Sequence, residues 1–265
     1  MVLMDGTGGC GSALESRSRE KVQVNVARVF KPLGWVLFLT LILLSVPKIA
    51  GIFADSFDYS RIDPDGSYAW LTVHHLAQAA IFLVLMMGTR SWKPVDFRLG
   101  WGNKKVGIAY VLRFILYFSL YLLGFLAFSI VTQSLQPFPF PLNARNIIGY
   151  LSFQLLVTGP SEEMIFRAFA LTMLGLYVQG HFLHGKISRA NVLAALTFGL
   201  AHVSFSFAPF QVTYSANQVL YAAGLGLFYG DCYEKSGSVI YPMIMHSMTN
   251  VLSVGAIAVI TALLR

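Results

Sequence analysis

Long apolar runs, separated by short polar stretches, dominate the pattern of the chain. A helix needs roughly 20 apolar residues to cross the bilayer core, so these runs predict an all-α, polytopic membrane protein. We expect seven such segments, at about 33–53, 68–88, 106–132, 146–178, 190–206, 214–233 and 239–264.

The segments at 106–132 and 146–178 are longer than a minimal span, so we expect them to tilt, kink or project into water. Gly159-Pro160 is a plausible break in the second of them, because proline lacks a backbone donor and clashes with the preceding turn. A split segment would add an eighth span. The pattern therefore predicts seven to eight transmembrane helices.

Residues 1–31 form a different region, rich in glycine and serine at first and then charged. We expect a mobile cytosolic tail here and a polytopic membrane domain over 32–265. No cleavable signal peptide is expected, because the first apolar stretch starts only near Leu33 and is long.

Composition supports a membrane protein, since 56% of the residues are hydrophobic and only 12% are charged, against about 25% in soluble domains. The net charge of +7 would also suit a nucleic-acid partner. We exclude that partner, because the basic residues flank apolar segments and no basic–aromatic platform is present. Cys10 and Cys232 are too few and too far apart for a disulfide framework, so free thiols are expected.

Lysine and arginine are concentrated in the N-terminal tail and in the loops that share its side of the membrane. This bias predicts a cytosolic N-terminus. We expect an integral, multi-pass protein of a prokaryotic plasma membrane, with an organelle membrane as the alternative. The pattern makes no prediction of the oligomeric state.

Polar and ionisable residues interrupt three of the apolar segments, where they are costly and usually face a partner or a water-filled cavity. They are Glu162, Glu163, Arg167, His202, His246 and Asn250. Glu163 and Arg167 are four residues apart and can pair on one helix face. Glu162 points about 100° away, so it can face a cavity while Glu163 is anchored.

These residue types suit hydrolysis of a peptide bond by activated water. A carboxylate and a histidine can together remove a proton from water. A second histidine and an asparagine amide can donate hydrogen bonds to the developing oxyanion. The predicted fold is then a helical bundle around a buried polar catalytic cavity.

Several alternatives stay open. Glu162, His202 and His246 could instead hold a catalytic zinc ion, although no His-Glu-x-x-His motif is present. The cluster could be only a structural network that joins helices. A proton-coupled transporter is a third alternative, but the chain lacks an obvious internal repeat. A serine or cysteine nucleophile is not supported, because no Gly-x-Ser-x-Gly motif occurs and neither cysteine is near the cluster.

At these residues the chain resembles the CPBP family of intramembrane proteases, also called the Abi or CAAX-protease family. The resemblance covers about 145–255 and rests on three motifs. They are Glu-Glu-x-x-x-Arg ending at Arg167, Phe-x-x-x-His ending at His202, and His-x-x-x-Asn ending at Asn250. One departure is Ala168, where many members have glycine.

The resemblance implies a membrane endopeptidase of eight helices that cuts a membrane-associated or lipidated, CAAX-like protein or peptide. It implies that Glu162 and His202 activate water, that His246 and Asn250 stabilise the oxyanion, and that Glu163 and Arg167 support them. Members have been called both metal- and glutamate-dependent, so the expected cofactor is none or a divalent metal such as zinc. Expected partners are membrane lipid and the substrate. A non-catalytic scaffold or bacteriocin-immunity protein is the main alternative.

Two further histidines, His74 and His75, lie in the second apolar segment. Neighbouring residues of a helix face different directions, so we do not expect these two to act together. A structural or interfacial role is predicted for both.

Overall fold

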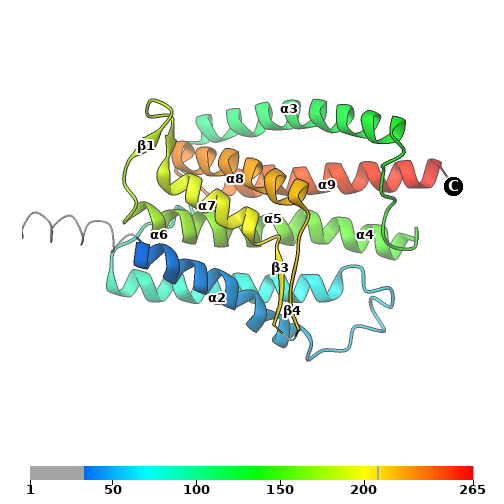
Figure 1. Ribbon diagram of the computed structural model, residues 1–265, viewed down its shortest axis with the longest axis horizontal. Coiled ribbons are helices and arrows are strands. Elements are labelled where there is room, and N and C mark those ends of the chain that lie inside the picture. The colour runs from blue at the N-terminus through cyan, green and yellow to red at the C-terminus, as the bar shows by residue number, and fades with distance from the viewer. Residues whose placement is uncertain (1–32, 208, 265) are drawn as a thin grey trace, which may run out of the picture.

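The computed structural model describes residues 33–207 and 209–264 and is mostly helical (Figure 1). The predicted mobile tail, 1–31, lies outside these residues. Most of the long helices run in a common direction, and α3, α9, α5 and α2 pack one against the next. Outside the motif segment the helices are Leu33–Ala54, α2 (Ala69–Trp92), α3 (Lys104–Val131), α7 (Arg189–Leu200), α8 (Ala216–Ser236) and α9 (Ile240–Leu263).

Within the described residues, four helices are long and apolar enough to cross a membrane: Leu33–Ala54, Ala69–Trp92, Lys104–Val131 and Ile240–Leu263. The chain is therefore a mostly helical membrane protein, but the prediction of seven to eight spans is not supported. α7 has only 12 residues and is too short to cross the bilayer core. α8 is long enough, but its residues are not apolar enough for it to count among the candidate spans.

The segment with the two glutamates is one unbroken helical run from 144 to 175, in which α-helical and π-helical stretches alternate. Its parts are α4 (Ala144–Phe153), η1 (Gln154–Thr158), α5 (Gly159–Glu163), η2 (Met164–Leu171) and α6 (Thr172–Gly175). The expected break at Gly159-Pro160 is absent, and the π-helical η1 ends directly before it. Such π-helical turns are rare in proteins as a whole, and those that occur are often found at functional sites.

Two short hairpins interrupt the helical pattern. β1 (His181–Phe182) pairs with β2 (Ile187–Ser188), and β3 (Ser204–Phe207) pairs with β4 (Phe210–Thr213), both antiparallel. The β3–β4 hairpin leaves the ends of α7 and α8 at a steep angle to the helices (Figure 1). The predicted segment 190–206 thus ends too late, and His202 lies in the turn after α7 rather than within a helix.

A close approach of two backbones sets the distance between the motif helices. A Cβ atom on Gly159 would lie 2.5 Å from Ser247 Oγ and 2.8 Å from the Ser247 backbone nitrogen. Only glycine lets α5 pack this tightly on α9, as small residues do at helix interfaces in membranes. This contact brings the glutamates of α5 beside His246 of α9.

The start of α2 is fixed by Asp63, in the loop between the first two spans. Its carboxylate accepts hydrogen bonds from the backbone N–H groups of Ser67, Tyr68 and Ala69 at 2.7–2.8 Å. Burial disfavours the charged form, but these bonds outweigh it and hold the pKa of Asp63 below its ordinary value. Ser67 Oγ also lies 3.1 Å from Asn146 Oδ1, which ties this loop to α4.

Candidate active site

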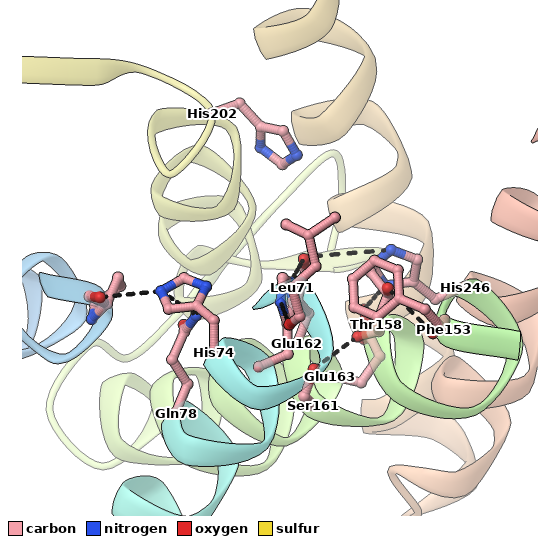
Figure 2. Close-up of polar contacts among 12 residues, drawn as sticks. Leu71, His74, Gln78, Phe153, Thr158, Ser161, Glu162, Glu163, His202 and His246 are labelled. Atoms are coloured by element: carbon pink, nitrogen blue, oxygen red, sulfur yellow. Dashed lines mark hydrogen bonds and ion pairs between the residues drawn. The ribbon is translucent and has the colours of Figure 1, made fainter. Parts of the chain in front are cut away.

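The two adjacent glutamates lie on α5, between the two π-helical stretches, and have different surroundings (Figure 2). The Glu163 side chain is completely buried, whereas that of Glu162 is 20% exposed. The sequence predicted this division, with one carboxylate anchored and the other partly open.

Glu163 joins two segments through one oxygen atom. Its Oε1 accepts a hydrogen bond from Arg167 Nη1 at 2.9 Å and another from His246 Nδ1 at 2.8 Å. The expected Glu163–Arg167 pair is therefore present. The Arg167 guanidinium also lies over the rings of Phe198 and Tyr229, at 4.6 and 5.4 Å from their centroids. Such contacts favour a buried cation.

His246 is held in one orientation. Because the Glu163 carboxylate accepts from Nδ1, the other ring nitrogen, Nε2, is directed toward Glu162, 3.8 Å from its Oε2. The Tyr229 ring stacks on the imidazole at 5.4 Å, and the Tyr229 hydroxyl is hydrogen-bonded to Thr249 Oγ1 at 2.6 Å. Packing and hydrogen bonds together leave the imidazole little freedom.

Glu162 has a second histidine neighbour that the sequence reasoning missed. His75 Nε2 lies 3.3 Å from Glu162 Oε1, while Oε2 is the oxygen nearer His246. The prediction of a structural or interfacial role for His75 did not anticipate this contact. The available signal was general: an ionisable residue within a span usually faces the interior of the bundle.

His202 stands apart from this cluster. Its Nδ1 donates to the Phe198 carbonyl oxygen at 3.0 Å, which fixes the ring beside the end of α7. Figure 2 shows its ring across from Glu162 without a direct bond. In the part of the chain that the structure describes, no hydrogen bond or ion pair joins His202 to Glu162 or His246.

Asn250 lies one turn after His246 on α9 and is half-buried. No hydrogen bond of its side chain is present among residues 33–207 and 209–264. The structure thus brings Glu162, Glu163, Arg167 and His246 into one contact network and leaves His202 and Asn250 outside it.

Comparison with known families bears on this arrangement. Residues 144–252 match the family model described as type II CAAX prenyl endopeptidase Rce1-like. These residues are an Rce1-like domain of the CPBP family. No curated protein and no solved structure matched the chain. The Rce1-like domain includes all six predicted site residues, whereas His75 on α2 lies before it.

The Rce1-like domain does not present a formed metal site among the described residues. No group of three or more histidine, cysteine, aspartate or glutamate side chains is arranged there to hold an ion. Glu162 and His246 are close, but His202 is not joined to them. Zinc binding by Glu162, His202 and His246 stays a prediction, and the effect of a chelator on activity tests it.

Proposed function

We propose that the protein is an intramembrane endopeptidase that hydrolyses a peptide bond of a membrane-associated or lipidated, CAAX-like protein or peptide. The observation that carries the proposal is the environment of Glu162. This carboxylate is partly open, stands between two imidazole rings and is backed by a buried Glu163. Its place in an Rce1-like domain supports a protease.

In the proposed reaction, Glu162 and His202 remove a proton from a water molecule that lies between them. The Nδ1–H of His202 is donated to the Phe198 carbonyl, so Nε2 carries the lone pair that accepts a proton. The water oxygen then bonds to the carbonyl carbon of the substrate. The proton passes to the leaving amine as the carbon–nitrogen bond breaks.

The oxyanion of the tetrahedral intermediate is stabilised by His246 and Asn250. His246 already donates through Nδ1 to Glu163, so it donates through Nε2 as well only when the ring is a cation. The role of Glu163 is to hold the His246 ring so that Nε2 is the nitrogen that points toward the site of the oxyanion.

The test is cleavage of a lipidated peptide library by protein reconstituted in lipid. We expect Glu162→Gln and His202→Ala to lower kcat by about 10²–10⁴-fold, the usual loss on removal of a general base. His181→Ala, in an exposed strand, is the matched control and should cleave normally. Cleavage at the normal rate by Glu162→Gln or by His202→Ala would refute the proposed mechanism.

One observation favours a second candidate, a non-catalytic scaffold or immunity-type protein. The contacts of Glu163 with Arg167 and His246 cross-link α5, η2 and α9 without any substrate. In that case Glu162→Gln should leave the cellular phenotype intact, while Arg167→Ala should destabilise the fold. Because removal of Arg167 should destabilise the fold in either case, the phenotype of Glu162→Gln is what distinguishes a scaffold from an enzyme.

A further inference from the structure

Among the described residues, His75 is the polar partner of Glu162 that lies outside the Rce1-like domain. It lies on α2 and contacts Oε1 of the carboxylate at 3.3 Å. The other oxygen, Oε2, remains toward His246 at 3.8 Å. The two carboxylate oxygens therefore have separate neighbours on separate helices.

The His75 ring is fixed by its own helix and by α4. Its Nδ1 lies 2.9 Å from the Leu71 carbonyl oxygen, which can only accept, so Nδ1 carries a hydrogen atom. Nε2 is then the nitrogen that faces Glu162, and it donates to Oε1 when the ring carries a hydrogen atom on both nitrogens. The Phe153 ring packs edge-on against the imidazole at 5.1 Å and blocks rotation on that side.

The adjacent histidine has the opposite arrangement. His74 Nε2 donates to the Pro47 carbonyl oxygen at 3.0 Å, and Gln78 donates to His74 Nδ1 at 3.1 Å. The Trp70 ring stacks on it at 4.7 Å. His74 thus joins α2 to the helix Leu33–Ala54. Both of its ring nitrogens form hydrogen bonds with groups other than the glutamates.

We propose that His75 is a positioning residue for Glu162. By holding Oε1, it fixes the carboxylate so that Oε2 is the oxygen that accepts the proton from water. Groups that orient a reacting side chain in this way are worth about 10–100-fold in activity. This role rests on the proposed function, in which Glu162 activates water.

The experiment compares kcat and KM for four purified variants. His75→Phe keeps the ring but loses the nitrogen, and we expect kcat to fall about 10–100-fold with little change in KM. His75→Gln keeps a donor that can reach Oε1 and should recover most of kcat. His74→Phe is the matched control and should keep the normal kcat. Glu162→Gln, measured in parallel, should lose about 10²–10⁴-fold in kcat.

Each outcome decides a separate point. A normal kcat in His75→Phe, together with the expected loss in Glu162→Gln, overturns the role of His75 alone. Full activity of Glu162→Gln overturns the proposed function and the role of His75 with it. Equal losses in His75→Phe, His75→Gln and His74→Phe would show that α2 matters only for folding. Should His75→Phe fail to fold, His75→Asn, whose amide is too short to reach Oε1, must show the same loss of kcat.

Discussion

One oxygen atom, Oε1 of Glu163, accepts hydrogen bonds from Arg167 and from His246. The second oxygen of Glu163 and Nη2 of Arg167 have no hydrogen-bond partner among the described residues. Both side chains are almost fully buried, so they have lost their hydrogen bonds to water. Hydrogen bonds within the protein replace only part of them. Removing either partner would leave an uncompensated charge in the interior.

We therefore expect Arg167→Met to lower the free energy of unfolding by about 3–5 kcal/mol. Reversible unfolding in mixed micelles measures this change. Lys235→Met is the matched control, because Lys235 and Asp231 also form an ion pair four residues apart, but Lys235 is 52% exposed. That exposed pair should contribute at most about 1 kcal/mol. Equal losses in the two variants would contradict a special cost for the buried pair.

The helical run from 144 to 175 depends on backbone contact with α9 as much as on its side chains. Gly159 is the position of closest approach, with the Ser247 nitrogen and the Met243 carbonyl oxygen 2.8 and 2.9 Å from where a Cβ atom would lie. Backbone atoms cannot turn aside as a flexible side chain can. A methyl group here must separate α5 from α9.

Gly159→Ala should lower the free energy of unfolding by about 1–3 kcal/mol, as overpacking does. It should also reduce peptide cleavage, because the Glu163–His246 contact spans the same two helices. Thermal unfolding in detergent and the cleavage assay measure the two effects. Gly255→Ala on α9, where no atom lies within 4 Å of an added Cβ, should be neutral or stabilising. Parallel behaviour of the two variants would argue against the close approach.

The sequence predicted the positions of the long helices because apolar length reports membrane burial directly. The segment predicted at 190–206 extends beyond α7 because apolar residues continue past Leu200. The Ser-Phe-Ser-Phe alternation of Ser204–Phe207 was the strand signal that the prediction missed. The Glu163–Arg167 pair was predictable from local spacing. The contact of His75 with Glu162 was not, because it joins positions 87 residues apart through packing that no local pattern encodes.

Over the molecule as a whole, the loop between the first two spans ties the N-terminal helices to the Rce1-like domain. Asp63 gathers the backbone N–H groups at the start of α2, and Ser67 bridges to Asn146 on α4. Asn146 in turn donates to Asp65 at 2.9 Å. The position of α2, and with it that of His75, depends on this loop.

The low pKa of Asp63 makes part of the stability dependent on pH. A carboxyl group whose pKa is lower in the folded state than in the unfolded state stabilises the fold when it is ionised. For Asp63 this stabilisation is fully present above pH 3.8, the ordinary pKa of the group, and it is lost as the pH falls through the lowered pKa. Asp63→Asn should therefore reduce the melting temperature at neutral pH, with the difference from wild type shrinking in acid below pH 3.8. Thermal unfolding across pH measures it. A difference that stays constant at all pH values would contradict the assignment.

The two π-helical stretches of the motif helix also affect where it can lose a residue. Each of these stretches holds a residue that a regular helix would omit. Deleting one residue within Gln154–Thr158 would let this stretch continue as a regular α-helix, with α4 and the glutamates keeping their facing directions. Deleting one residue within the regular α4 would instead turn the residues before it by about 100° relative to the glutamates. The π-helical stretch is thus a point at which the helix can change its length without turning its two ends against each other.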